Sequence, residues 1–483
     1  MTGDRRPDPS GPGPVADPEG PALRLHTAWV AAAIGGEIVR GDPGREFGGV
    51  SIDTRTLAPG ELYIAIRGER FDGADFAPAA IDAGAAGVVV PRGRGSDVRN
   101  SVVIEVDDTT RALQALARAV RRASGTKVVA ITGSAGKTTT KEITAEFLGA
   151  RYRVIRNRGN FNNHIGLPLS LIELRQRPEI AVVELGMNHA GEISTLIGVA
   201  EPDVRVWTNV GDAHLGFFAS VDAIADAKAE ILERADATTR LVANADDDRV
   251  MARVARFPGR TVTFGIDREA GVRASAIVDR GIDGIGARVT TARGTVDITT
   301  PLVGRGNLAN VLAAMAVATE FDVPLDAMAA RAATLQAARH RGEVVRLAGG
   351  VTVLDDSYNA SPAATLRALD VLAQARVGRR IAVLGEMLEL GGHAVARHRD
   401  VGRAAAKANV DVLFTVGGDA ALALADAAVA AGLARARVRH FATSDEAAEA
   451  VAALVTRGDL VLVKGSRGVK TDRVVERLTA GQR

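Results

Sequence analysis

The sequence predicts an α/β protein with three domains in series. Short apolar runs that are typical of strands alternate along the chain with helical stretches, and one of these strands leads into a glycine-rich loop. Alternation of this kind is typical of parallel sheets that are covered by helices on both faces. The chain of 483 residues is long enough for about three domains of ordinary size.

The expected domain boundaries follow changes in composition. Residues 1–22 are rich in proline, glycine and aspartate, and they predict a disordered tail. A first domain is expected over residues 23–124, because an amphipathic helix ends there just before a glycine. A central domain is expected over residues 125–338, and a C-terminal domain over residues 339–483.

The composition excludes several functional classes. Lys plus Arg number 60 and Asp plus Glu number 58, and this balance argues against a nucleic-acid partner. Cysteine is absent, which excludes disulfides, cysteine-bound metals and a thioester route to amide bonds. Neither a signal peptide nor an apolar run of about 18 residues is found, so no membrane association is expected. These features favour a cytoplasmic enzyme.

The expected strands follow from apolar runs bounded by turn residues. They lie at residues 49–53, 61–66 and 87–90 in the first domain, at residues 127–131, 180–184, 204–209 and 240–243 in the central domain, and at residues 351–354, 380–384, 412–416 and 459–464 in the C-terminal domain. A helix is expected at residues 76–83. The central sheet is predicted to be parallel.

A phosphate-binding loop is expected at the end of the first central strand. The glycines of this loop let backbone N–H groups and the N-terminus of the next helix (residues 141–148) face phosphate oxygens. Lys137 is expected to reach the β- and γ-phosphates, and the Thr138 hydroxyl is expected to face Mg²⁺. The loop is shorter than the usual Walker A motif, because Ile131 stands where that motif has its first glycine. The predicted ATP contacts in the loop are Gly133, Ser134, Ala135, Gly136, Lys137, Thr138 and Thr139. The alternative is a glycine-rich turn that happens to contain a lysine.

This loop and the segments after it resemble the Mur ligases. Residues 160–168 match the Asn-x-Asn-x-x-Gly-x-Pro segment of that family. Glu184 ends a strand and is followed by Leu-Gly-Met-Asn, and the resemblance implies that it binds the Mg²⁺ of the nucleotide. The alternative for Glu184 is a carboxylate that only caps the next helix.

Lys228 lies within a stripe of apolar residues on a helix that is expected over residues 221–232. A buried ammonium is costly, and burial lowers the pKa of lysine, so a neutral amine able to react with carbon dioxide is expected there. The resemblance implies that Lys228 is carbamylated and that, together with His214, it serves a second Mg²⁺. The alternative for Lys228 is a side chain that reaches to the solvent. The alternative for His214 is a structural role.

Further nucleotide contacts are implied by two later segments. Residues 304–310 match the family signature Gly-x-His-Asn-x-x-Asn, with Gly306 in place of the histidine. By resemblance, Asn307 and Asn310 bind ATP, and Asn310 contacts adenine. Arg341 corresponds to the family's arginine that reaches the γ-phosphate, and Asp356 is expected to face the nucleotide at the end of a strand.

The N-terminal segment 51–55 resembles the UDP-sugar-binding domain of the family, which implies substrate contacts from Ser51, Thr54 and Arg55. Thr54 stands where a serine is common, and Ala74 stands where a histidine is common. The resemblance therefore implies a UDP-sugar-binding α/β domain, a central P-loop ATPase-like domain and a Rossmann-like C-terminal domain.

Three C-terminal segments (residues 355–362, 384–391 and 463–467) look like the family member that adds D-alanyl-D-alanine to UDP-N-acetylmuramoyl-tripeptide. The implied reaction uses ATP and two Mg²⁺ ions and passes through an acyl phosphate in peptidoglycan synthesis. Its partners are small molecules, and a monomer is expected. Three alternatives stay open: a sibling ligase that adds a diamino acid to UDP-N-acetylmuramoyl-dipeptide, a folylpolyglutamate synthase, and a P-loop nucleotide switch.

Overall fold

The computed structural model describes residues 21–480, except residues 97, 100 and 158. Most of the predicted N-terminal tail therefore lies outside the described residues. Contacts between Cα atoms divide the chain into two compact units. The first contains the described residues up to Val128 together with Arg153–Ala181 and Gly198–Glu201, and the second contains the remainder. Each unit is described by itself.

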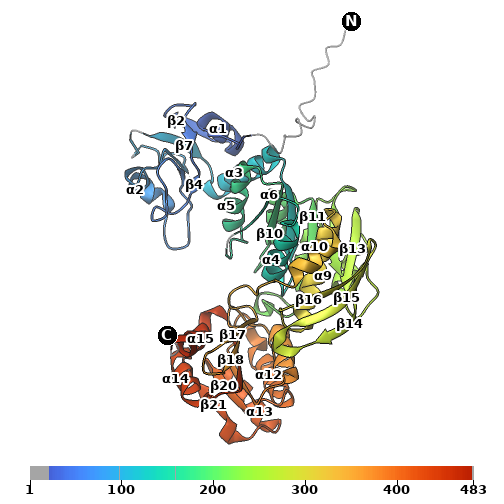
Figure 1. Cartoon of the computed structure of the whole chain (residues 1–483). Coiled ribbons are helices and arrows are strands. Elements are labelled where there is room, and N and C mark those ends of the chain that lie inside the picture. The colour runs from blue at the N-terminus through green and yellow to red at the C-terminus, as the bar shows by residue number, and fades with distance from the viewer. Residues whose placement is uncertain (1–20, 97, 100, 158, 481–483) are drawn as a thin grey trace. The chain divides into compact units, whose positions relative to one another are not determined.

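The first unit is built around a five-stranded sheet with the order β2-β7-β6-β5-β4. Figure 1 labels β2, β7 and β4 of this sheet. The strands from β4 to β7 are parallel, and β2 pairs with β7 in the antiparallel direction. Two further short strands, β1 and β3, pair with each other. The strands are β1 (Leu25–His26), β2 (Glu37–Arg40), β3 (Glu46–Phe47), β4 (Val50–Ser51), β5 (Leu62–Ile64), β6 (Gly87–Pro91) and β7 (Val102–Val106).

Three helices, α1 (Thr27–Ile34), α2 (Ala77–Asp82) and α3 (Thr109–Ser124), accompany this sheet. The carboxylate of Asp108 accepts hydrogen bonds from the first backbone N–H groups of α3, which fixes where this helix begins. Gly125 takes a left-handed conformation and ends it, as the Ser-Gly pair in the sequence predicts.

A nine-stranded sheet carries the glycine-rich loop, and its order is β16-β15-β14-β13-β12-β11-β8-β10-β9. Strands β8 and β11 to β14 are parallel neighbours in this order, whereas β14, β15 and β16 are antiparallel. The expectation of a purely parallel central sheet was therefore wrong at this edge. The strands are β8 (Lys127–Thr132), β9 (Val154–Arg156), β10 (Ile180–Glu184), β11 (Val204–Trp207), β12 (Arg240–Asn244), β13 (Arg260–Gly265), β14 (Val272–Asp279), β15 (Ile285–Thr291) and β16 (Gly294–Thr300).

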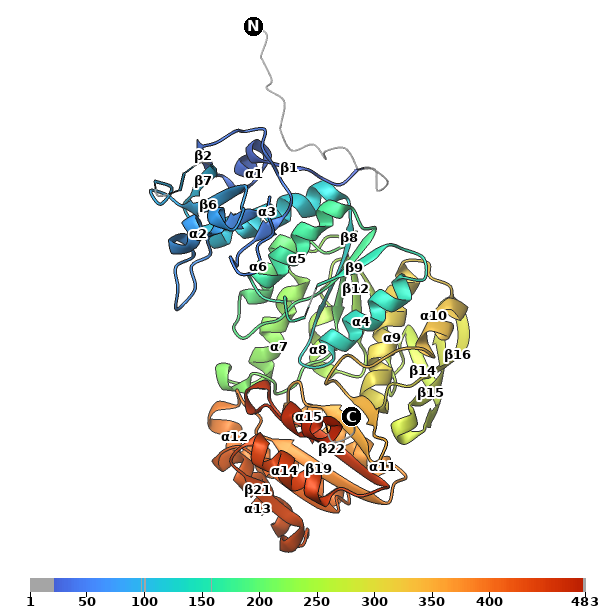
Figure 2. The same cartoon turned by 60° about the vertical axis from the view of Figure 1, so that its left-hand side comes forward.

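Helix α9 is buried along most of its length and packs along strands β12 to β15 (Figure 2). It also packs against α4, the helix that follows the glycine-rich loop. The helices of this part of the chain are α4 (Lys137–Leu148), α5 (Gly166–Ile172), α6 (Glu192–Ala200), α7 (Val221–Ala229), α8 (Asp248–Val254), α9 (Gly304–Glu320) and α10 (Leu325–Ala332).

The C-terminal part of the second unit contains a six-stranded sheet with the order β17-β18-β22-β19-β20-β21. All neighbours are parallel except β17 and β18. The strands are β17 (Glu343–Arg346), β18 (Thr352–Asp356), β19 (Arg379–Gly385), β20 (Val412–Val416), β21 (Val438–Phe441) and β22 (Asp459–Lys464). The helices are α11 (Pro362–Gln374), α12 (Ala394–Lys407), α13 (Asp419–Ala430), α14 (Ser444–Leu454) and α15 (Asp472–Ala480).

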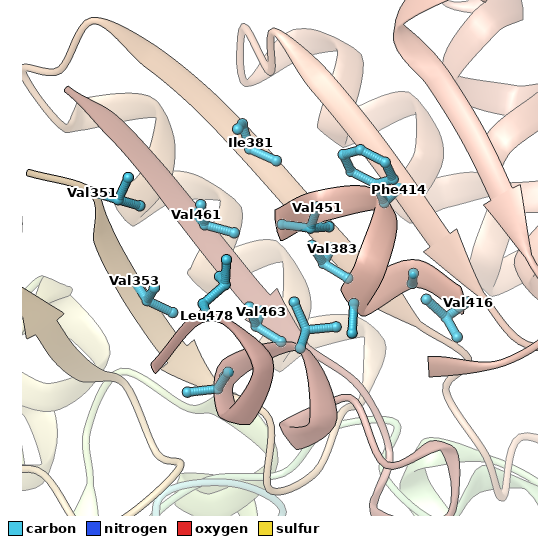
Figure 3. Close-up of a cluster of buried hydrophobic side chains, with 14 residues drawn as sticks. Val351, Val353, Ile381, Val383, Phe414, Val416, Val451, Val461, Val463 and Leu478 are labelled. Carbon is cyan, nitrogen blue, oxygen red and sulfur yellow. The ribbon is translucent and has the colours of Figure 1, made fainter. Parts of the chain in front are cut away.

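One face of this sheet forms a core with α14 and α15 (Figure 3). Alternate residues of four neighbouring strands point to this face, as Val461 and Val463 do on β22. Val451 of α14 and Leu478 of α15 close the core from the other side. β-Branched side chains dominate it, as is typical of parallel strands that are buried on both faces.

Several boundaries differ from the prediction by a few residues. Helix α4 begins at Lys137 rather than at residue 141, because the helix starts directly from the loop. The helix expected over residues 221–232 divides into α7 and the 3₁₀ turn Glu230–Leu232. Among the described residues, no helix is long and apolar enough to cross a membrane.

Candidate active site

Glycines shape the loop between β8 and α4. Gly133 and Gly136 have φ angles of +150° and +83°, which residues with a side chain rarely adopt. A Cβ atom on Gly133 would lie 1.9 Å from Thr208 Oγ1, and one on Gly136 would lie 2.3 Å from Asn310 Oδ1. Both positions therefore require glycine for conformation and for space. The loop leads directly into α4, so the free N–H groups of the first helical turn lie beside it.

The segment after β11 holds the loop in place. The Ala135 N–H donates to Asn209 Oδ1 at 2.9 Å, and Asn209 Nδ2 donates to the Ala135 carbonyl at 3.0 Å. The Thr208 hydroxyl donates to the same carbonyl at 2.8 Å. Further along, the Gly211 N–H donates to Ser134 Oγ at 2.8 Å. Thr208 and Asn209 were not predicted as site residues, although their place directly after a strand of the same sheet was a signal for them.

Lys137, Thr138 and Glu184 meet at the start of α4. The Thr138 hydroxyl donates to Glu184 Oε2 at 2.6 Å, and Lys137 Nζ donates to the Gly133 carbonyl at 2.9 Å. Lys137 keeps part of its surface exposed, yet the dense protein around its ammonium lowers its pKa by desolvation. Glu184 opposes this shift in pKa, and the nearby Arg341 adds to it. The structure thus brings four predicted site residues together.

Lys228 on α7 is 1% exposed, and burial lowers its pKa well below the ordinary value of 10.5. The positive charge of Lys137 lowers it further, whereas Glu184 raises it. The charge of Lys228 is therefore sensitive to the charges of Lys137 and Glu184. A lysine that reaches to the solvent does not fit this burial, so the amine is expected to be neutral and nucleophilic.

The donor set at the loop suits one magnesium ion. The Thr138 hydroxyl and the Glu184 carboxylate offer hard oxygen ligands beside a phosphate-binding loop, and Mg²⁺ usually takes one or two carboxylates together with phosphate oxygens and water. Within the described residues, no group of three or more His, Asp or Glu side chains is arranged to hold a metal ion. A second ion near Lys228 fits only if that amine becomes an anion.

Asn310 on α9 lies beside the loop and is 9% exposed. Its Oδ1 accepts a hydrogen bond from the Thr140 hydroxyl, and its Nδ2 donates to Asn307 Oδ1, both at 3.2 Å. A Cβ atom on Gly306 would lie 3.3 Å from Cδ of Arg367. The side chain of Arg367, on α11, therefore borders the space that a histidine at position 306 would use.

Arg341 stacks on Tyr358, with its guanidinium carbon 3.9 Å from the ring centroid. Such stacking restricts the orientation of a forked cation. Asp355, which is 1% exposed, accepts hydrogen bonds from Ser357 Oγ at 2.6 Å and from His340 Nδ1 at 2.7 Å. These two bonds join the side chains of the residues that directly precede Arg341 and Tyr358 to one carboxylate.

Asp356 does not present a free carboxylate. Its Oδ2 accepts a hydrogen bond at 2.5 Å from Nζ of Lys464, a residue that is 3% exposed and ends β22. The Lys464 ammonium also donates to the Asn359 carbonyl at 3.0 Å. Asp356 and Lys464 are direct neighbours in the register of β18 and β22, so the parallel sheet itself sets this ion pair.

His214 contacts Glu389 rather than the cluster around Lys137. Its Nδ1 lies 2.6 Å from Glu389 Oε2. The hydrogen bond with His214 lowers the pKa of Glu389, although partial burial opposes that shift. Glu389 lies within a segment that the sequence analysis used only for comparison, and nothing in the sequence joins it to a histidine 175 positions earlier.

The residues predicted to contact UDP belong to the first unit. Ser51 is 9% exposed, and its hydroxyl donates to the Asp53 carbonyl at 3.1 Å. Arg55 pairs with Asp53 at 2.6 Å, and hydrogen bonds from Arg55 lower the pKa of Asp53 to about 2. The side chain of Arg55 is 86% exposed. Thr54 lies in the same turn, between Asp53 and Arg55.

A cavity of about 530 Å³ opens at the carboxyl ends of the C-terminal strands. It lies beside the N-termini of α13 and α14, where parallel α/β sheets commonly bind ligands. Leu388 and Val469 give it apolar walls, and Lys470 and Arg473 give it positive charge. Arg467 lies close in sequence but pairs with Asp472 at 2.8 Å.

Comparisons with known proteins agree with this arrangement. Three family models match successive parts of the chain: the Mur ligase family catalytic domain at residues 46–121, the Mur ligase middle domain at residues 131–318, and the Mur ligase glutamate ligase domain at residues 340–467. A UDP-N-acetylmuramoyl-tripeptide–D-alanyl-D-alanine ligase from Bacillus subtilis (strain 168) is 35% identical over 431 residues, which cover 89% of this chain and 93% of that protein.

Solved structures are similar over most of the chain. MurF from Acinetobacter baumannii has a TM-score of 0.86 at 29% identity and covers 95% of this chain and 100% of its own. A MurF ligase from Thermotoga maritima in complex with ADP has a TM-score of 0.79 at 28% identity, covering 89% of this chain and 97% of its own. The predicted α/β architecture with three domains in series is confirmed. The chain therefore belongs to the Mur ligase family, a family of ATP-dependent ligases.

Proposed function

We propose that this chain joins D-alanyl-D-alanine to UDP-N-acetylmuramoyl-tripeptide in peptidoglycan synthesis, at the expense of ATP. The observation that carries the proposal is the similarity to ligases of this name over 89% of the chain, including its C-terminal part. The carboxylate of the tripeptide attacks the γ-phosphorus of ATP, ADP leaves, and an acyl phosphate forms. The amine of the dipeptide then attacks the acyl carbon, and phosphate and a proton are released.

Lys137 and Arg341 supply the charge that this phosphoryl transfer requires. The positive charge of Arg341 lowers the pKa of Lys137, and the two cations are proposed to act on one phosphoryl group. Ser134 and Ala135 donate their N–H groups to Asn209, and the N–H groups of Gly136 and of the residues up to Thr139 are proposed to bind the phosphates. Asn307 and Asn310 are proposed to hold the adenosine side of ATP, and Asp356 to act in the same site through its ion pair with Lys464.

Thr138 and Glu184 are proposed to hold Mg²⁺ next to the phosphates. The ion would offset negative charge on the phosphoryl oxygens. Lys228 is proposed to react as a neutral amine with carbon dioxide, which gives a carbamate and releases a proton. The carbamate and His214 would then hold a second Mg²⁺, because the change from ammonium to anion removes the repulsion that the lysine would otherwise exert.

The cavity beside Lys470 and Arg473 is proposed to receive the dipeptide. Its two cations suit the terminal carboxylate, and Leu388 and Val469 suit the methyl groups. Of these cations, Arg473 also lies 3.6 Å from a Glu476 oxygen, which leaves Lys470 as the main candidate for the carboxylate. In the first unit, Ser51, Thr54 and Arg55 are proposed to contact the UDP group. We also propose a monomeric cytoplasmic enzyme without membrane or nucleic-acid partners.

Phosphate release with purified protein tests the proposal. We expect ATP-dependent release with UDP-N-acetylmuramoyl-tripeptide and D-alanyl-D-alanine together, and little release when either is left out. Preference for UDP-N-acetylmuramoyl-dipeptide with lysine or diaminopimelate would assign the chain to the sibling activity. Release that needs neither a carboxylate nor an amine would favour a nucleotide switch.

Lys470→Ala tests the acceptor site separately, with Lys407→Ala at the end of α12 as a control for the loss of a surface lysine. The first variant is expected to raise KM for D-alanyl-D-alanine while KM for ATP stays unchanged. An equal KM for the dipeptide in both variants would remove the cavity from the proposal.

A further inference from the structure

His214 and Glu389 form a close pair between segments that are 175 positions apart in the chain. His214 follows β11, and Glu389 follows β19. The Nδ1 atom of the imidazole lies 2.6 Å from Glu389 Oε2. The side chain of His214 is 19% exposed and that of Glu389 is 44% exposed, so water reaches both partners and the contact is not a simple consequence of burial.

Both residues have unusual backbone conformations. His214 has a φ angle of +66° and Glu389 one of +64°, in the left-handed region that favours glycine. Residues with side chains in this region carry a conformational cost, and such residues concentrate at functional sites. Two of them in direct contact indicate that the surrounding structure maintains the geometry of this pair.

Three hydrogen bonds hold the segment that carries Glu389. The Gly216 N–H donates to the Glu389 carbonyl at 2.7 Å. The Leu388 N–H donates to Ser466 Oγ at 2.9 Å, and the Met387 N–H donates to Nε2 of His398 at 2.9 Å. His398 is fully buried, and its Nδ1 bonds to the Ala394 carbonyl at 2.7 Å. The carboxylate of Glu389 therefore projects from a backbone that is fixed at three successive residues.

A carboxylate that accepts the Nδ1–H of an imidazole selects one tautomer of the neutral ring. The other nitrogen, Nε2, then carries the free lone pair, and it is the atom that can bind a metal ion or accept a proton. We propose that Glu389 is a positioning residue, which holds His214 as the Nδ1–H tautomer with Nε2 free for a divalent cation. The part of this inference that concerns the cation rests on the proposed function, whereas the part that concerns the tautomer does not.

The tautomer can be observed in metal-free protein without substrate. In protein labelled with ¹⁵N-histidine, two-bond ¹⁵N–¹H correlations identify the protonated nitrogen of each of the eight histidines. The His214 signal is the one that disappears in His214→Gln. We expect Nδ1 protonation in the unchanged protein and a mixture of both tautomers in Glu389→Gln, because a carboxamide either donates or accepts. Glu449→Gln serves as the control, because it removes a surface carboxylate elsewhere that pairs with Arg477. This variant is expected to leave the His214 signal unchanged.

Binding of Mn²⁺ in the presence of ADP tests the second part. Removal of a residue that orients a metal-binding histidine lowers metal affinity by roughly 10–100-fold, so this loss is expected for Glu389→Gln. In the His214→Gln background the same change is expected to have no further effect, since Glu389 then has no histidine to orient. If Glu389→Gln does not fold, Glu389→Ala takes its place with the same expected outcomes.

Two results would overturn the inference. The first is an unchanged His214 tautomer in Glu389→Gln. The second is Mn²⁺ affinity that is unchanged in Glu389→Gln, or that falls equally with and without His214. Failure of the proposed function is distinguishable, because an enzyme without ligase turnover but with the expected change of tautomer would refute the substrates and leave the positioning role intact.

Discussion

Substitution of Gly136 by alanine tests whether the loop geometry, rather than the lysine alone, makes the nucleotide site. Two costs are expected. A left-handed residue with a Cβ atom costs about 1–2 kcal/mol. The new Cβ would also lie 2.3 Å from Oδ1 of Asn310, so it would displace a side chain that makes hydrogen bonds with Thr140 and Asn307. With about 1 kcal/mol for each of these two bonds, the total destabilisation is about 3–4 kcal/mol.

Gly458→Ala separates these two costs. Gly458 has a φ angle of +91°, and a Cβ atom there would meet no neighbour within 4 Å, so it carries only the conformational cost. We expect Gly136→Ala to have the lower melting temperature of the two variants. We also expect it to bind ATP at least about tenfold more weakly in calorimetric titration. This factor corresponds to a loss of about 1.4 kcal/mol in the free energy of binding. Equal melting temperatures and an unchanged affinity for ATP would refute the reasoning.

Three further predictions concern the charged groups of the site. Lys137→Ala is expected to fold normally and to lose turnover by orders of magnitude, and near-normal phosphate release would contradict its role. Lys228→Met tests burial through pH. Since the pKa of Lys228 is lowered in the folded state, the unfolded chain binds the extra proton between that pKa and 10.5, and stability therefore rises with pH there by up to about 1.4 kcal/mol per pH unit. In Lys228→Met, the free energy of unfolding is expected to rise less steeply with pH, as measured by thermal unfolding. A slope equal to that of the unchanged protein would contradict the lowered pKa of Lys228. Arg341→Lys keeps the charge but loses the stacking on Tyr358, so its turnover is expected to fall more than tenfold, and full activity would show that charge alone suffices.

Buried parallel strands could be predicted almost to the residue. The expected strands at residues 180–184, 412–416 and 459–464 correspond to β10, β20 and β22 without a shift. Each contains at least three consecutive apolar residues, because both of its faces are covered. The antiparallel strands at the edge of the central sheet were missed. Half of β14 is exposed, so its sequence is mixed in polarity and lacks a clear period of two.

The local parts of the candidate site could also be predicted. Lys137 and Thr138 follow a strand and a glycine-rich loop, and helical spacing places Lys228 on an apolar face, where the structure buries it. The roles of these residues stay predictions. The membership of the Mur ligase family, which the motifs indicated, is confirmed by similarity over most of the chain.

Contacts between distant segments set the limit of such reasoning. Asp356 was expected to face the nucleotide, and its partner Lys464 was not foreseen, because that lysine is 108 positions later and reaches Asp356 only where β18 and β22 are neighbours. Glu389 and His214 meet although they follow strands of two different sheets, β19 of the six-stranded sheet and β11 of the nine-stranded sheet. A sequence motif gives the type of side chain at the end of a strand, whereas strand order decides which strand ends meet. Pairs of this kind become visible only when the order of strands is known, and they are therefore the residues for which mutational tests add most to the motifs.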